Sequence, residues 1–83
     1  MNNLYIIEEV LSDYTAGMVV IAAPSIERCR ELFVEKFCRR AGQPVGSCRK
    51  LEEYDRSIEG GYYKVIENVN HNEGIVSYVI GGG

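Results

Sequence analysis

The chain has no tryptophan, a single histidine and only two prolines among its 83 residues. It also lacks any apolar run near the roughly 18–20 residues that a membrane-spanning helix needs, which argues against a membrane partner. Residues 1–27 contain no lysine or arginine, so the beginning of the chain lacks the positive segment of a signal peptide. These absences predict a soluble protein of the cytoplasm.

Cysteine is scarce and irregularly spaced. Cys29, Cys38 and Cys48 are odd in number and follow no disulfide framework, so we expect reduced thiols. Together with His71 they hold the residue types of a zinc site, but none of the close pairs that typify one. Cys29 and Cys38 fall on or near the apolar face of a predicted helix, where free cysteine packs as a small hydrophobe. We therefore expect core packing, with no metal and no cofactor.

The composition predicts one globular domain over residues 1–83. Hydrophobic residues make up 46% of the chain and charged residues 25%, which is ordinary for a folded domain. The net charge of −3 argues against direct binding of nucleic acid, because proteins with that function usually carry a basic surface. The glycines at 81–83 predict a short flexible tail.

The first half of the chain predicts a β-hairpin followed by a long helix. Residues 4–11 begin with a continuous apolar run, which is typical of a strand buried on both faces at its start. Turn residues at 13–17 separate this strand from a second apolar run at 18–22. Ser25 is a suitable N-cap, and from Ile26 onward apolar residues recur at three- and four-residue steps, which predicts the helix.

Residues 43–61 leave two alternatives open. Helical spacing of the apolar residues favours a short second helix over a strand across 47–58. Residues 62–69 and 75–80 then predict two further strands, joined by a turn at 70–74.

In chain order these elements make two hairpins with a helical segment between them. The predicted fold class is α+β, a two-layer sandwich of order ββα(α)ββ with about four mostly antiparallel strands, one long helix and a short second helix. Nothing obvious in the sequence protects the two edges of such a sheet, so a homodimer is a further alternative.

No group of residues completes a catalytic site, and we predict that the protein is not an enzyme. Glu8 and Glu9 are neighbours on a predicted strand, so their side chains point to opposite faces. Glu52 and Glu53 are neighbours on the predicted short helix, where adjacent side chains do not face each other. A thiol–imidazole pair that used His71 would lack the other groups such a site needs.

Tyrosine is the abundant aromatic residue, with six copies. Three of the six lie close together in the sequence, next to acidic residues. Tyrosine is enriched in protein interfaces because it joins a large apolar body to a polar group, although such rings also pack along the edge of a core. The predicted protein-binding site is this acidic, aromatic group: Glu52, Glu53, Tyr54, Asp55, Tyr62 and Tyr63.

The apolar strand at 4–10, the loop after it, and the segment 21–26 that leads into an amphipathic helix form a recognisable pattern. Over residues 4–38 this pattern resembles one class of small phage-encoded anti-CRISPR proteins. The resemblance implies a binder that occludes a site on a larger protein or nucleoprotein complex, and so an inhibitor of a host defence complex in the host cytoplasm. It implies no particular functional residue, because these inhibitors act through whole surfaces.

The element order and the glycines at 81–83 support an alternative function. A ββα…ββ domain that ends in glycines resembles the ubiquitin-like β-grasp family, including its sulfur carriers. That resemblance implies a carrier whose C-terminal carboxylate, at Gly83, is activated by an adenylating enzyme.

Overall fold

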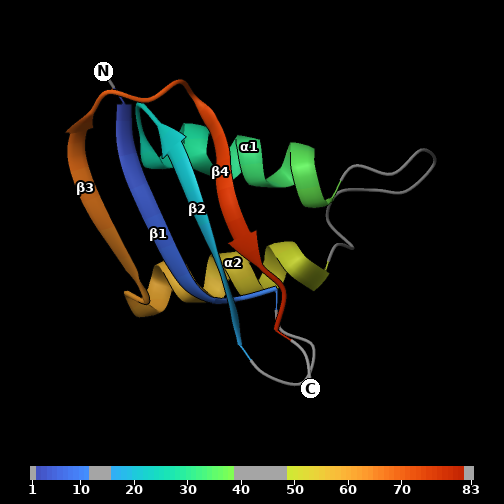
Figure 1. Ribbon diagram of the computed structural model, residues 1–83. Helices are drawn as coiled ribbons and strands as arrows, with labels where there is room; N and C mark the ends of the chain where they lie inside the picture. The colour runs from blue at the N-terminus through green and yellow to red at the C-terminus, as the bar shows by residue number, and fades with distance from the viewer. Residues whose placement is uncertain (1, 12–15, 39–48, 82–83) are drawn as a thin grey trace.

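The computed structural model describes residues 2–11, 16–38 and 49–81. It contains one four-stranded antiparallel sheet, and both helices pack on the same side of it (Figure 1). This arrangement confirms the predicted two-layer α+β fold. The elements are β1 (Asn2–Val10), β2 (Gly17–Ala23), α1 (Ile26–Phe37), α2 (Arg49–Gly60), β3 (Tyr63–Val69) and β4 (Gly74–Val79).

The strands lie in the order β3-β1-β2-β4, so only β1 and β2 form a hairpin. The prediction of a second hairpin from the last two strands is therefore wrong: β3 and β4 lie at opposite edges of the sheet. The connection at 70–73 crosses the ends of the two central strands instead of turning tightly (Figure 1). This order places the two most apolar strands, β1 and β2, at the centre of the sheet. Each of them is hydrogen-bonded to a neighbouring strand on both sides.

The start of α1 and the end of α2 follow elementary capping rules. The Ser25 side chain accepts a hydrogen bond from the Arg28 backbone N–H at 3.2 Å, which confirms Ser25 as the N-cap of α1. The second helix confirms the helical alternative for residues 49–58, while residues 47 and 48 lie outside the described residues.

The end of α2 has the hydrogen-bond pattern of a Schellman motif. The Tyr62 N–H donates to the Ser57 carbonyl at 2.9 Å, and the Gly61 N–H donates to the Ile58 carbonyl at 3.2 Å. Gly61 has a φ of 77°, a conformation that glycine adopts without steric cost. The motif turns the chain directly from α2 into β3.

The core lies between the sheet and the helices. Alternate side chains of the central strands, such as Ile7 and Val19, point toward the helices and are buried. A row of aromatic rings runs through this layer and out to the edge of the sheet. Its members are Tyr54, Phe33, Phe37 and Tyr78, with successive ring centroids 4.7, 4.8 and 5.2 Å apart.

The cysteine predictions hold only in part. Cys29 is a free, fully buried thiol in α1, which confirms its predicted place in the core. Cys38 is also buried, but it is disulfide-bonded, so the expectation of a reduced thiol is wrong for this residue. The spacing of cysteines along the sequence does not show which of them the fold brings close enough to form a disulfide.

Gly81 is held more firmly than a flexible glycine tail would be. Gly81 is buried, and its N–H donates to the Leu11 carbonyl at 2.9 Å. The flexible tail that we predicted for residues 81–83 therefore does not begin at Gly81, and residues 82 and 83 lie outside the described residues.

Candidate functional site

The structure separates the six tyrosine and acidic residues that the sequence grouped together. The Tyr54 ring is in the core with 1% of its surface exposed, so a partner cannot reach it. Tyr63 is half-buried against the same core. Asp55 accepts two hydrogen bonds from the Arg30 guanidinium, at 2.9 and 3.0 Å, and ties α2 to α1. Glu52 is exposed on α2.

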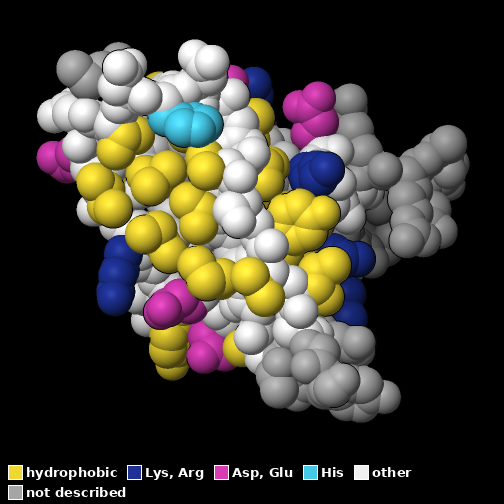
Figure 2. Space-filling view, viewed as in Figure 1, with side chains coloured by type: hydrophobic (Ala, Val, Ile, Leu, Met, Phe, Trp, Pro, Cys, Tyr) yellow, Lys and Arg dark blue, Asp and Glu magenta, His cyan; other side chains and the backbone are white. Residues whose placement is uncertain are grey.

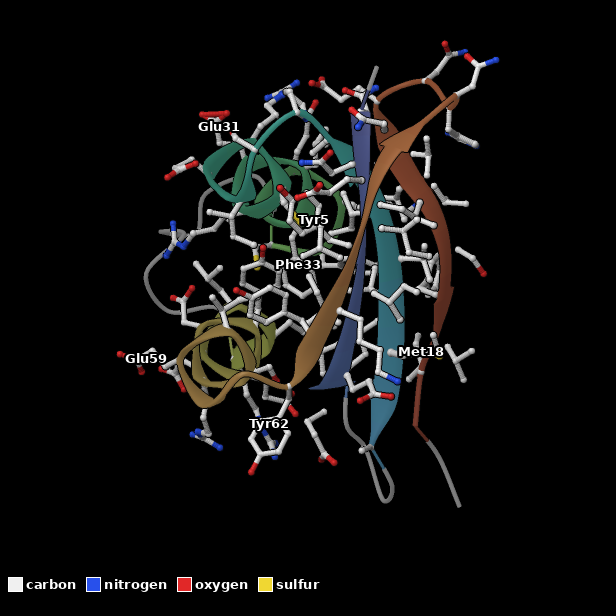
Figure 3. All side chains as sticks on the ribbon, turned by 90° about the vertical axis from the view of Figure 1, so that its left-hand side faces the viewer. Tyr5, Met18, Glu31, Phe33, Glu59 and Tyr62 are labelled. Carbon is white, nitrogen blue, oxygen red and sulfur yellow. The ribbon has the colours of Figure 1, made fainter. Side chains whose placement is uncertain are left out.

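Glu53 and Tyr62 remain together, in a hollow of about 330 Å³ beside the C-terminal half of α2. Figure 3 shows Tyr62 below the end of this helix, on the helix side of the sheet. We call this site the α2 hollow. The residues that line it are Glu9, Glu53, Arg56, Ser57 and Tyr62.

Backbone hydrogen bonds on both sides fix the position of Tyr62. Its N–H is held by Ser57 through the helix cap, and its carbonyl accepts a hydrogen bond from the Glu8 N–H at 2.9 Å. The ring lies over Gly60, where an added Cβ atom would come within 2.6 Å of it. Tyr62 is 54% exposed, so the fold presents this ring to solvent from a fixed backbone.

Glu9 enters the hollow through an irregularity in β1. The pairing of β1 with β2 shifts register between Glu8 and Val10, and Glu9 has a φ of 61°. A non-glycine residue in this left-handed region is strained by roughly 1–2 kcal/mol. The Ser57 hydroxyl donates to the Glu9 carbonyl at 3.1 Å and holds the bulge against α2.

Sequence reasoning missed Glu9, Arg56 and Ser57. It treated Glu8 and Glu9 as neighbours on a regular strand, and the bulge changes where the Glu9 side chain points. Arg56 and Ser57 gave no signal, because a charged residue and a serine on a short helix are ordinary. These residues come together only because α2 packs against β1 in the folded chain.

The α2 hollow is lined by charged and aromatic groups that can bind a partner. It offers two carboxylates, an exposed aromatic ring and one guanidinium. Of its two hydroxyls, that of Ser57 donates to the Glu9 carbonyl and that of Tyr62 is a phenol, and its lining residues include no thiol or imidazole. Carboxylates next to a tyrosine face are groups that attract a basic side chain.

The buried thiol of Cys29 is not a second reactive site. Burial raises its pKa to about 11, although an interaction with the Tyr54 hydroxyl partly opposes this shift. That hydroxyl is buried without a conventional hydrogen-bond partner among the described residues, so its interaction with the thiol is looser than an ordinary hydrogen bond. A protonated, inaccessible thiol is a poor nucleophile.

The raised pKa of Cys29 predicts a loss of stability at alkaline pH. The unfolded thiol ionises near its ordinary pKa of 9.0, whereas the folded thiol keeps its proton up to about pH 11. The contribution to stability is therefore fully present below pH 9.0 and is lost as the pH rises through about 11. Urea unfolding across this range should show a fall in unfolding free energy on the order of 2 kcal/mol. The Cys29→Ala variant should show a shallower fall, and an equal fall would contradict this assignment.

A second hollow, of about 480 Å³, lies at the other edge of the sheet between α1 and β4. Lys36, Val76 and Tyr78 are among its lining residues, and the Lys36 ammonium lies 5.8 Å from the centre of the Tyr78 ring. The residues described here contain no group of three histidine, cysteine or acidic side chains that could hold a metal ion.

No described helix has the length and apolar composition needed to cross a membrane. Comparisons with protein-family models, with curated proteins and with solved structures found no match to this chain.

Proposed function

We propose that the protein is a non-enzymatic protein-binding module that uses the α2 hollow to bind a basic segment of a larger protein or nucleoprotein complex. The observation that carries this proposal is the Tyr62 ring, held exposed on a fixed backbone in a hollow that Glu9 and Glu53 also line. Rigid, exposed tyrosines are typical anchors of protein interfaces, because little conformational entropy is lost when they bind.

The biological setting that we propose is inhibition of a host defence complex in the host cytoplasm, as in the anti-CRISPR proteins that residues 4–38 resemble. The mild negative charge of −3 suits a basic partner surface, and direct contact with nucleic acid is not part of the proposal. The alternative carrier function has less support, because the N–H of Gly81 donates a hydrogen bond to the Leu11 carbonyl and ties the first of the glycines 81–83 to the fold.

The proposal is tested by capture of a partner from host lysate on the immobilised protein, followed by measurement of the dissociation constant of the purified complex. Tyr62→Ala and Glu53→Lys should each raise that constant by at least about tenfold, the effect expected of an interface anchor. The matched control is Glu52→Lys, which makes the same charge change on the same helix outside the hollow. If Glu52→Lys and Glu53→Lys weaken binding equally, the hollow is not the binding site.

Glu9 allows binding to be separated from folding. Glu9→Gly removes both the strain at φ 61° and the carboxylate. We expect the free energy of unfolding to rise by about 1 kcal/mol while partner binding weakens. A variant that is more stable and binds as well as the wild type would show that this carboxylate is not used.

A further inference from the structure

The face of the sheet opposite the helices is apolar and uncovered by any described element. Figure 2 looks onto this face and shows hydrophobic side chains gathered over the strands, and Figure 3 shows Met18 on the opposite side of the sheet from Phe33. We call it the outer face. Strand alternation assigns to it the apolar residues Leu4, Ile6, Met18, Val20, Ile66, Val69 and Val79, together with Ala22, which is fully buried by its neighbours.

The pattern of the two central strands is that of a sheet covered on both sides. An antiparallel sheet with one solvated face has strands that alternate between apolar and polar residues. Here residues 4–7 in β1 and 18–23 in β2 are apolar without interruption. The helices cover only one side of the sheet. In the isolated chain, the strand that we predict to be buried on both faces is therefore covered on one face only.

The outer face extends over all four strands. Four strands about 4.8 Å apart and some six residues long span roughly 19 by 20 Å, a projected area of about 380 Å². That is about half of the roughly 800 Å² that each partner buries in a standard interface, so two such faces suit a small interface between copies. Ile66 and Val79, at opposite edges, are 48% and 56% exposed, so the patch extends across the whole sheet.

The charges on this face are compatible with a second copy of itself. Strand alternation places Glu8 and Lys64 on this face, and they have opposite signs. The chain's one histidine, His71, lies at the rim of the same face (Figure 2). Lys64 is opposite Ile6 in the sheet register, and Glu8 is two residues further along β1. A two-fold axis that passes between them would bring each Glu8 close to the Lys64 of the other copy. The two helices hold seven acidic and six basic side chains, a net charge of −1, and would lie on the outside.

We propose that the chain forms a homodimer in which the outer faces of two copies pack against each other. The result is a four-layer arrangement of helices, sheet, sheet and helices, with the two sheets about 10 Å apart. Tyr62 lies on the helix side, so both α2 hollows stay accessible (Figure 3). The dimer does not depend on the proposed partner binding, and it would give such binding two equivalent sites.

The test is the mass of the full chain in solution by size-exclusion chromatography with light scattering. The wild type should have twice the chain mass of 9.3 kDa at micromolar concentration. Ile66→Lys should raise the dimer dissociation constant at least about 100-fold, because the buried charge appears twice in a symmetric interface. Val79→Lys is an independent second variant at the other edge of the sheet.

Val65→Lys is the matched control. Val65 is adjacent to Ile66 on β3 and is similarly exposed, at 41%, but its side chain points to the helix side. It should remain a dimer, with the same circular dichroism spectrum as Ile66→Lys. A wild type that stays monomeric at submillimolar concentration would overturn the proposal. The outer face would then be covered by a different protein or by no partner. An unchanged dimer in both Ile66→Lys and Val79→Lys would also overturn it, in favour of pairing through the sheet edges.

Discussion

Replacing Tyr54 by alanine should lower the free energy of unfolding by about 4 kcal/mol, as is typical for removal of a large buried aromatic side chain. The ring is almost fully buried, and its centroid lies 4.7 Å from that of Phe33 in the neighbouring helix. Its loss would leave a cavity between α1 and α2 that neither helix can close without moving from the sheet. Urea unfolding followed by circular dichroism measures the effect.

Tyr54→Phe is the control that separates the ring from its hydroxyl. The hydroxyl is buried without a conventional partner among the described residues, so its removal relieves a cost instead of breaking a strong hydrogen bond. We expect stability to stay the same or to rise by up to about 1 kcal/mol. A loss as large as that of the alanine variant would mean that the contact with the Cys29 thiol is a strong one.

Replacing Gly17 by alanine should cost about 3 kcal/mol, although it adds only one methyl group. Gly17 is the first residue of β2, and it lies between the ends of β1 and β4. An added Cβ atom would collide with the Val79 carbonyl oxygen, and it would also lie 2.8 Å from the Gly81 nitrogen and 2.9 Å from the Val10 carbonyl oxygen. All three are backbone atoms, so no side-chain rotation can relieve the clash.

Gly60→Ala makes the same chemical change at a position where the neighbouring atoms belong to a side chain that can move. The atoms that it meets belong to the exposed Tyr62 ring, and alanine suits the end of a helix better than glycine does. Thermal unfolding should show Gly17→Ala well below the wild type and Gly60→Ala near it or above it. Equal effects of the two substitutions would mean that the sheet can open at Gly17.

The parts of the fold that follow from local pattern could be predicted from the sequence. The first hairpin, the N-cap at Ser25 and the helical character of 49–58 all follow from residue spacing and short-range hydrogen bonds. Strand partners could not be predicted in the same way. The turn-like composition of 70–74 suggested a hairpin, but nothing local in it reveals that β3 and β4 flank the first two strands.

The candidate site shows the same limit. Helical spacing is consistent with either Tyr54 or Asp55 on the buried side of α2, because adjacent positions differ by only about 100° around a helix. The structure buries Tyr54 and leaves Asp55 to bind Arg30. The place of Glu9 depends on a bulge, and the outer face depends on which side of the sheet the helices cover. Neither is encoded in a short stretch of sequence.

The connection between β3 and β4 acts as a strap across the sheet. The two strands are three strand spacings apart, about 14 Å, whereas the five steps from Val69 to Gly74 can reach only about 17 Å when fully extended. Two contacts hold the strap: the Asn2 amide donates to the His71 carbonyl at 2.9 Å, and Arg28 donates to Glu73 at 2.8 Å. The edge strands are therefore mechanically linked although they never touch, so detachment of one puts tension on the other.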